Sequence, residues 1–163
     1  MNEQITFEIE NQSPFTACVF TGHRELYDDF SYDKLLKIIE ELCKQGVKTF
    51  YNGMAKGFDL VSAKIVLELK EKYDIKLVAC IPYLNQEKYF PEQEKQTYYE
   101  ILNQADEKVL ITEKYYKGCL LARNRYMVDR ADCMVAYLKK DEGGTAYTVN
   151  YFKRKCGGKI YFV

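Results

Sequence analysis

Residues 47–72 read VKTFYNGMAKGFDLVSAKIVLELKEK, and this stretch decides the fold class. It opens with a short apolar run at 47–51, continues with a turn that contains two glycines (NGMAKG), and ends in a helical pattern from Asp59 onward. A short apolar run followed by turn residues and then a helical pattern is typical of a strand–turn–helix unit. We therefore predict a strand over 47–51 and a helix over 59–72.

The same unit recurs on both sides of this stretch. Residues 16–20 (TACVF) predict a strand, and residues 31–45 predict a helix that Ser31 caps and Gly46 ends. A third strand at 76–81 (KLVACI) should stop at Pro82. Further strands are expected at 107–112, 132–138 and the terminal KIYFV, with helices at about 92–105, 118–130 and 145–156.

Alternating strands and helices indicate βαβ units and therefore a parallel sheet that helices cover on both faces. The chain has 163 residues, a length that suits one domain. We predict an α/β fold: a single Rossmann-like domain with a mostly parallel sheet of about six strands. It should occupy residues 16–163, and residues 1–15 should form an N-terminal lead-in.

Composition excludes several classes of protein. Lys plus Arg and Asp plus Glu both number 24, so the net charge is zero, and a nucleic-acid partner is not expected because such proteins usually carry a basic excess. Six scattered cysteines and the single histidine, His23, predict no metal site. No signal peptide is recognisable, and no apolar run approaches the roughly 20 residues of a membrane helix. We expect a cytoplasmic protein with no membrane partner.

Three glycine-bearing turns follow predicted strands: residues 21–24 (TGHR), 52–59 (NGMAKGFD) and 141–145 (DEGGT). In an open parallel sheet, ligands bind outside the carboxyl ends of the strands. Glycine lets a backbone approach a ligand, and a helix that starts after such a turn presents free N–H groups to an anion. The predicted ligand-binding residues are Thr21, Gly22, His23, Arg24, Gly53, Met54, Ala55, Gly57, Asp59, Arg123, Gly143, Gly144 and Thr145.

Several of these residues also fit structural roles. Asp59 fits a helix cap as well as a ligand contact, and His23 fits a hydrogen-bonded loop residue. Arg125 and Asp129 lie four residues apart, so they fit a solvated helix pair as well as a ligand-facing site. The tyrosines that follow strand ends are candidates for stacking on a base: Tyr83, Tyr115 and Tyr116.

Four motifs in this order resemble the YpsA-like proteins of the SLOG superfamily: TGHR at 21–24, NGMAKGFDLVSA at 52–63, ARNRYMVDRAD at 122–132 and GGTAYTV at 143–149. The resemblance implies a Rossmann-like fold and a nucleotide or nucleotide-derived ligand at the glycine-rich edge of the sheet. On this basis residues 16–163 are expected to be a SLOG-type nucleotide-binding domain.

Two further groups show related motifs. The "lonely guy" phosphoribohydrolases carry Gly-Gly-x-Gly-Thr-x-x-Glu, and Thr148 stands here where that family has its catalytic glutamate. Hydrolysis of an N-glycosidic bond would then need Asp59 or Glu142 as a substitute carboxylate. The DNA-processing protein DprA resembles this chain in its glycine loop and its Arg-Asn-Arg segment, residues 123–125.

The leading prediction is therefore a protein that binds a nucleotide-like small molecule, as a sensor or regulator and not as an enzyme, and that has no resident cofactor. The alternatives are a nucleotide N-glycosidic hydrolase and a DprA-like binder of single-stranded nucleic acid. A protein partner that reads the bound state and a homo-oligomer both stay open.

Overall fold

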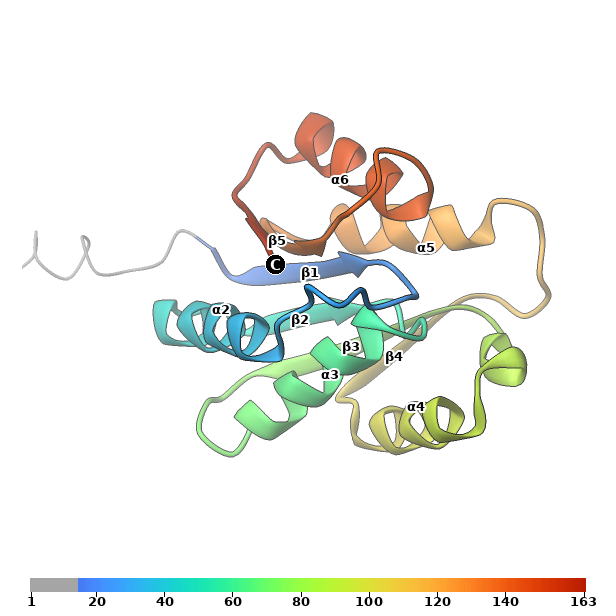
Figure 1. The fold of residues 1–163 in the computed structure, drawn as a ribbon, viewed down its shortest axis with the longest axis horizontal. Helices are drawn as coiled ribbons and strands as arrows, with labels where there is room; N and C mark the ends of the chain where they lie inside the picture. Colours follow the sequence, from blue (N-terminus) through green and yellow to red (C-terminus); the bar gives the residue numbers. More distant parts are fainter. Residues whose placement is uncertain (1–14) are drawn as a thin grey trace, which may run out of the picture.

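The computed structural model describes residues 15–163, so the predicted lead-in lies outside the described residues except for Phe15. Its centre is one six-stranded sheet in which every pairing is parallel, with the order β4-β3-β2-β1-β5-β6 (Figure 1). The prediction of about six mostly parallel strands is confirmed. The strands are β1 (Ala17–Gly22), β2 (Thr49–Asn52), β3 (Lys76–Tyr83), β4 (Glu107–Thr112), β5 (Cys133–Tyr137) and β6 (Ile160–Phe162).

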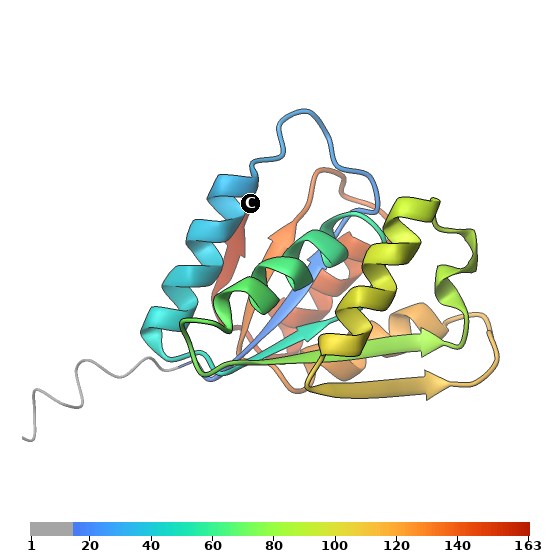
Figure 2. The same cartoon turned by 90° about the horizontal axis from the view of Figure 1, so that it is seen from below.

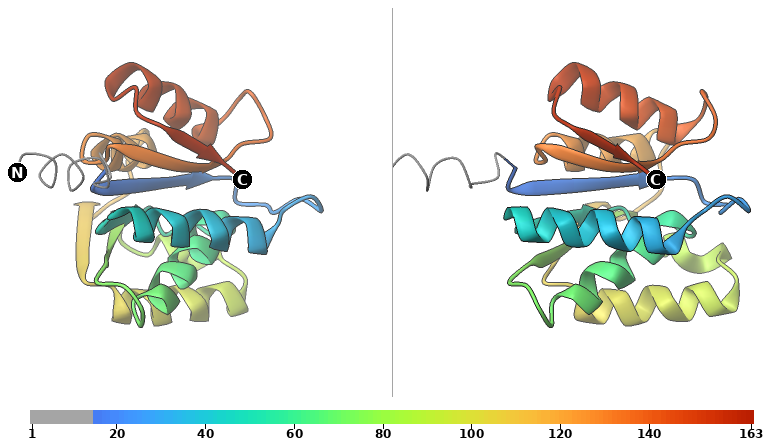
Figure 3. Two further views of the ribbon diagram at one scale, coloured as in Figure 1. Left: turned by 90° about the vertical axis from the view of Figure 1, so that its left-hand side faces the viewer. Right: turned by 60° about the vertical axis from the view of Figure 1, so that its left-hand side comes forward.

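Helices cover both faces of the sheet, as predicted. On one face lie α2 (Tyr32–Gln45), α3 (Phe58–Leu69) and α4 (Glu92–Gln104), which Figure 2 shows in front of the strands. On the other lie α5 (Cys119–Val128) and α6 (Gly144–Lys155), as both views of Figure 3 make clear. A short 3-10 turn, η1 (Gln86–Tyr89), precedes α4. None of the helices within residues 15–163 combines the length and the apolar character needed to cross a membrane.

Each face of the sheet has its own hydrophobic core. Successive side chains of a strand point to opposite faces, and β1 illustrates this: Cys18 and Phe20 join the core under α2–α4, while Val19 joins the core under α5 and α6. All three side chains have no exposed surface. The continuous apolar run of β1 is therefore needed because the strand is buried on both sides.

The local signals that set element boundaries are mostly confirmed. The Ser31 hydroxyl accepts the N–H of Lys34 at the start of α2, and Gly46 ends that helix with a φ of 108°. The expected stop at Pro82 is wrong, because β3 continues to Tyr83. Its pairing with β2 ends at Ala79, and from there β3 pairs with β4 alone. Proline is tolerated where a strand has lost one of its neighbours.

The strand order reverses at β1, which lies between β2 and β5. Strands β2 to β4 extend from one side of β1, and β5 and β6 extend from the other. At such a switch the connections leave toward opposite faces and open a crevice at the carboxyl ends of the strands. The fold therefore places a crevice beyond the end of β1.

Candidate functional site

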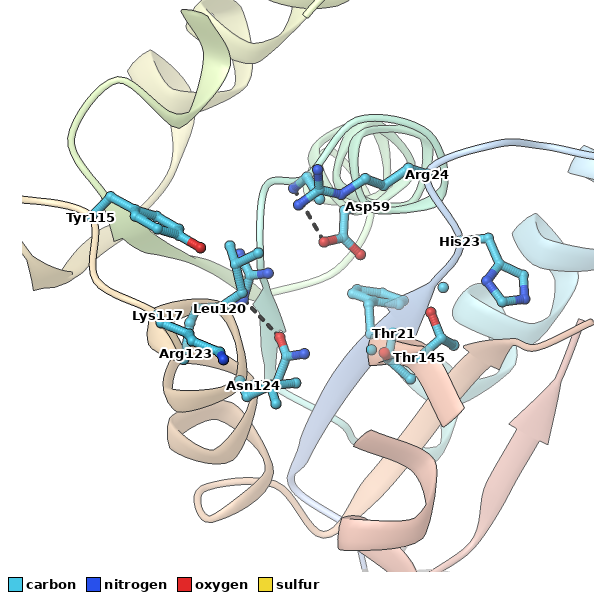
Figure 4. A pocket seen from close by; sticks show the side chains of 16 residues that line it. Thr21, His23, Arg24, Asp59, Tyr115, Lys117, Leu120, Arg123, Asn124 and Thr145 are labelled. Atoms are coloured by element: carbon cyan, nitrogen blue, oxygen red, sulfur yellow. Dashed lines mark hydrogen bonds between the residues drawn. The ribbon is translucent and has the colours of Figure 1, made fainter. Parts of the chain in front are cut away.

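A pocket of about 580 Å³ occupies this crevice (Figure 4). Its wall combines the end of β1 and the loop that follows it, the start of α3, the first turns of α5 and the start of α6. The sheet thus gathers four segments that are far apart in the sequence. The lining residues are Phe20, Thr21, Gly22, His23, Arg24, Ala55, Asp59, Tyr115, Lys117, Gly118, Leu120, Leu121, Arg123, Asn124, Gly144 and Thr145.

Two helices begin at this pocket without a side-chain cap. Gly118 precedes α5 with a φ of 101°, Gly143 precedes α6 with a φ of 91°, and neither helix start has a side-chain hydrogen bond. A Cβ placed on Gly118, Gly143 or Gly144 would have no neighbouring atom within 4 Å. The first N–H groups of a helix have no partner inside the helix, and they carry the positive end of its dipole. At α5 the N–H of Cys119 donates to the Tyr116 carbonyl at 3.1 Å. The donors that the two helix starts offer to an anion are therefore those of the next residues of α5 and of the first turn of α6.

The β2–α3 loop at 53–57 also precedes a helix, but the N–H groups of Met54, Ala55 and Gly57 are already bonded within the protein. The N–H of Ala55 donates to Asp59 Oδ2 (3.2 Å), and the N–H of Gly57 donates to Glu94 Oε2 (2.9 Å). Two carboxylates thus occupy positions that a phosphate would need. Two more donors are bonded: the N–H of Met54 to Asn52 Oδ1 (2.8 Å) and that of Phe58 to the His23 carbonyl (3.2 Å).

The glycines of this side make room for protein atoms. A Cβ on Gly22 would lie 2.3 Å from the Phe58 ring, and one on Gly57 would lie 2.3 Å from the Arg24 carbonyl oxygen. A Cβ on Gly53 would meet the Arg123 guanidinium at 2.9 Å. Gly57 also has a φ of 80°, which side chains other than glycine rarely adopt. Close packing within the chain accounts for these three glycines.

Arg123 joins the two sides of the pocket. Its side chain is 4% exposed; Nη1 donates to the Gly53 carbonyl and Nε donates to Asn124 Oδ1 at 2.7 Å. Asn124 Nδ2 donates to the Thr148 hydroxyl, which donates to the Gly144 carbonyl at 2.7 Å. This chain of hydrogen bonds fixes the start of α6 relative to the β2–α3 loop. Burial lowers the pKa of Arg123, while the nearby Asp59 raises it.

Asp59 is the buried carboxyl group of the pocket. The residue is 6% exposed, and burial raises its pKa from 3.8 to about 6 against the opposing effects of Arg123, the Ala55 N–H and Arg24. Its Oδ1 is buried and has no hydrogen-bond partner within residues 15–163. Figure 4 shows Arg24 reaching past the carboxyl group. Gly57, and not Asp59, is the N-cap of α3, so the helix-cap interpretation is wrong.

His23 holds two loops of the pocket together. Its Nε2 accepts the N–H of Lys139 at 2.8 Å, which ties the loop after β1 to the loop after β5. An ion pair between Lys139 Nζ and Asp29 Oδ2 at 2.7 Å links the same two loops. Burial, with the charges of Lys140 and Lys139, lowers the pKa of His23. A neutral imidazole is the form that can accept the Lys139 N–H, so the contact and the lowered pKa agree.

Nine of the thirteen predicted ligand-binding residues line the pocket, and four do not. Met54 is fully buried in the core, while Gly53 and Gly57 contact protein atoms as described. Gly143 precedes α6 just outside the lining. Glu142 is exposed and lies outside the lining as well. The nine are Thr21, Gly22, His23, Arg24, Ala55, Asp59, Arg123, Gly144 and Thr145.

The sequence reasoning missed the start of α5 as a part of the pocket. Gly118 is the first residue of the helix predicted at about 118–130, and a glycine at the start of a predicted helix is the signal that singled out Gly143 and Gly144. Among the candidate tyrosines, Tyr115 lines the pocket and is 61% exposed, and Tyr83 packs edge-on against it. Tyr116 lies outside the lining. The lining residues that were not predicted are Lys117, Gly118, Leu120, Leu121 and Asn124, together with Phe20.

Two other arginines, Arg125 in α5 and Arg130 just after it, do not line the pocket. Arg125 Nη1 donates to the Tyr147 hydroxyl at 3.2 Å, and Asp129 Oδ1 accepts the Tyr151 hydroxyl at 2.8 Å. In the described part of the chain, no ion pair joins Arg125 to Asp129. The guanidinium of Arg130 lies 3.5 Å from the centre of the Tyr126 ring. The helix-pair interpretation of the Arg125–Asp129 spacing is therefore wrong.

An all-parallel sheet with its strand order reversed at β1 and a pocket at that reversal defines a Rossmann-like α/β protein. The model of the YspA SLOG family matches residues 14–162. The chain therefore belongs to the YspA SLOG family, as the four sequence motifs predict.

Several bacterial proteins are similar in sequence. The chain is 32% identical to YoqJ, an uncharacterized SPbeta prophage-derived protein of Bacillus subtilis, over 136 residues that cover 75% of this chain and 80% of that one. It is 31% identical to a UPF0398 protein of Bacillus cereus, with coverage of 90% and 82%. It is 30% identical to the UPF0398 protein YpsA of B. subtilis, with coverage of 66% and 63%.

Two solved structures share the fold. One is DNA processing protein A of Helicobacter pylori, in a study of its single-stranded DNA binding mode, with a TM-score of 0.67 at 20% identity over 90% of this chain. The other is DprA of Streptococcus pneumoniae, with a TM-score of 0.66 at 18% identity over 91% of this chain. The chain spans 64% and 50% of those two proteins, respectively.

Proposed function

We propose that the chain binds a nucleotide-derived, phosphate-bearing small molecule in the pocket beyond β1, as a sensor or regulator. The observation that carries this proposal is the meeting of two uncapped helix starts, α5 and α6, at one pocket. Their free N–H groups and dipoles favour an anion. Lys117 and Arg24, which line the same pocket, add positive charge. The volume of about 580 Å³ lies in the range of small-molecule sites.

Asp59 supplies a different kind of contact. Its Oδ1 is a buried acceptor that no other described residue satisfies, and leaving such an atom unbonded costs free energy. A hydroxyl or amino group of the ligand would satisfy it, as a carboxylate satisfies a ribose hydroxyl in many dinucleotide sites. Tyr115, exposed at the rim, offers a face for a base. In this proposal the phosphate lies at the helix starts and a sugar lies toward Asp59.

The lining favours binding over hydrolysis. Glycosidic hydrolysis commonly uses two carboxyl groups, and Asp59 is the single one in this lining, since Glu142 lies outside it. Thr148, at the position of the glutamate in the "lonely guy" motif, has no exposed surface and bonds to the Gly144 carbonyl. Asp59 alone is left as a candidate catalyst, with its pKa of about 6.

The test is a binding panel on the purified full chain. We would titrate nucleoside mono-, di- and triphosphates, dinucleotides and a single-stranded oligodeoxythymidylate by calorimetry, and check each mixture for released base by chromatography. The expected result is saturable binding of at least one small nucleotide without release of base. Release of base would favour the hydrolase. Tight oligonucleotide binding that weakens steeply with salt, with no small nucleotide bound, would favour the nucleic-acid function.

Matched variants at one glycine locate the phosphate. Gly144→Asp puts a carboxylate at the start of α6, where an added Cβ has no heavy atom within 4 Å. It should repel the phosphate while it suits the helix dipole. Gly144→Ala adds a Cβ without a charge and serves as the control. Equal affinity of the aspartate and alanine variants would contradict the proposed position of the phosphate.

A further inference from the structure

A second pocket, of about 260 Å³, lies between α4, η1 and the outer strands β3 and β4. Its walls are largely apolar and include Ile81, Tyr98 and Leu102. It shares no lining residue with the pocket beyond β1. The two sites are therefore separate, and each can be tested without the other.

Glu87 gives this second pocket a polar end. The residue lines the pocket and is only 7% exposed. Its Oε1 accepts the Tyr99 hydroxyl at 3.1 Å, while its Oε2 is buried and has no hydrogen-bond partner. A buried acceptor of a charged type is costly to leave unbonded, and a donor brought by a ligand would remove that cost. The chain thus presents an acceptor that no residue of its described part satisfies.

The mouth of the pocket is apolar and faces solvent. Leu84 is 50% exposed, Leu110 is 42% exposed, and Tyr99 is 46% exposed. Leu110 belongs to β4, which is the edge strand of the sheet and pairs with no other described strand on its outer side. Covering apolar surface of this kind is favourable, because that surface is removed from contact with water. Apolar walls, an apolar mouth and one buried acceptor together describe the chemistry of an occupant.

We propose that this pocket binds a small apolar amine. Its ammonium group donates to the Glu87 carboxylate, and its hydrocarbon body covers Leu84 and Leu110. An ammonium is favoured over a neutral donor because a hydrogen bond between charged partners is roughly twice as strong as a neutral one. The space corresponds to roughly nine water volumes, which suits a body of about ten non-hydrogen atoms. Lys108, also in the lining, is exposed.

The probe is phenethylamine, with 2-phenylethanol and ethylbenzene as a neutral donor and a donor-free analogue. We would titrate each into the ¹⁵N-labelled full chain and follow the amide signals of η1, α4 and β4. The expected result is a saturable shift confined to these segments, with phenethylamine binding at least tenfold more tightly than 2-phenylethanol. No saturable shift at these residues, or equal affinity for the amine and the alcohol, would overturn the proposal.

Variants assign the effect to one carboxylate. Glu87→Gln should weaken phenethylamine at least tenfold and leave ethylbenzene unchanged, while the control Glu107→Gln, on the exposed start of β4, should change neither. Leu110→Lys, at the exposed mouth, is a second variant in case Glu87→Gln loses its fold, and it should weaken the amine through charge repulsion. Unchanged phenethylamine affinity in folded Glu87→Gln, or in Leu110→Lys, would refute the assignment.

Discussion

Two glycine-bearing loops of this chain look alike in sequence and differ in what surrounds them. The β2–α3 loop at 53–57 precedes α3, and the β5–α6 loop ends at Gly143, directly before Gly144 begins α6. In the first, a Cβ on either glycine would come within 3 Å of Arg123 or Arg24 atoms, and the donors bond to protein acceptors. In the second, Gly143 and Gly144 border open space.

The difference shows that a glycine in the sequence indicates that another group can come close to the backbone. It does not indicate whether that group belongs to the protein or to a ligand. In the β2–α3 loop the approaching group is part of the chain itself, so the glycines hold the site together. Beside Gly144 that space is open, and Gly144 lines the pocket, so a ligand can use it. Substitutions in the first loop should therefore lower the free energy of unfolding. Substitutions at the second should mainly lower the affinity for the ligand.

The largest expected effect is on stability, from Gly57→Ala. The added Cβ would lie 2.3 Å from the Arg24 carbonyl oxygen, and the φ of 80° is strained for alanine. We expect the free energy of unfolding to fall by about 3 kcal/mol or more, which is the range for strain combined with overpacking. Chemical denaturation measures it. A loss below about 1 kcal/mol would show that the loop is not held by this packing.

The next effect is on binding, from Gly144→Asp. We expect affinity for the bound nucleotide to fall about 100-fold relative to Gly144→Ala, which is about 2.7 kcal/mol. The free energy of unfolding should stay within about 0.5 kcal/mol of the wild type, as at exposed sites. Calorimetry measures the affinity, and chemical denaturation measures the free energy of unfolding. If Gly144→Asp lost much stability while its affinity stayed unchanged, the glycines of both loops would be needed for packing and not for binding the ligand.

The fold was predictable because its signals are local. The Ser31 cap, the Gly46 end and the apolar run of β1 each depend on neighbouring residues, and each is confirmed. The functions of the glycines were not predictable, because Phe58 fills the space beside Gly22 and Arg123 fills that beside Gly53 through long-range packing. Sequence spacing carries no information about such contacts. Gly118 was missed although its position before a helix resembles that of Gly143.

A smaller effect concerns Asp59 and pH. Burial raises its pKa from 3.8 to about 6, so the folded state disfavours the charged form. The wild type should therefore lose stability relative to Asp59→Asn as pH rises from about 4 to about 6, and the difference should be constant above that. A difference of about two pKa units corresponds to about 3 kcal/mol as an upper value. Denaturation of both proteins across this pH range measures it. A pH-independent difference would contradict the raised pKa.

The smallest effect concerns His23, which links the loops after β1 and β5. Its pKa is lowered, so the neutral form is favoured by folding, and the stability it contributes is present above pH 6.5 and lost as pH falls through the folded pKa. As the single histidine, it gives one imidazole titration by NMR. We expect a midpoint below 6.5, with the Lys139 amide shifting at the same pH. A midpoint above 6.5 would contradict the contact between Nε2 and that amide.

The central claim is that the ligand's phosphate lies at the starts of α5 and α6 and not at the β2–α3 loop. A crystal structure of the chain with the tightest-binding nucleotide of the panel tests it most directly. We predict phosphate oxygens within hydrogen-bond distance of the N–H groups of Gly144 and Thr145, with Gly57 still bonded to Glu94. A phosphate bound to the N–H groups of residues 53–57, with Asp59 or Glu94 displaced, would contradict the claim.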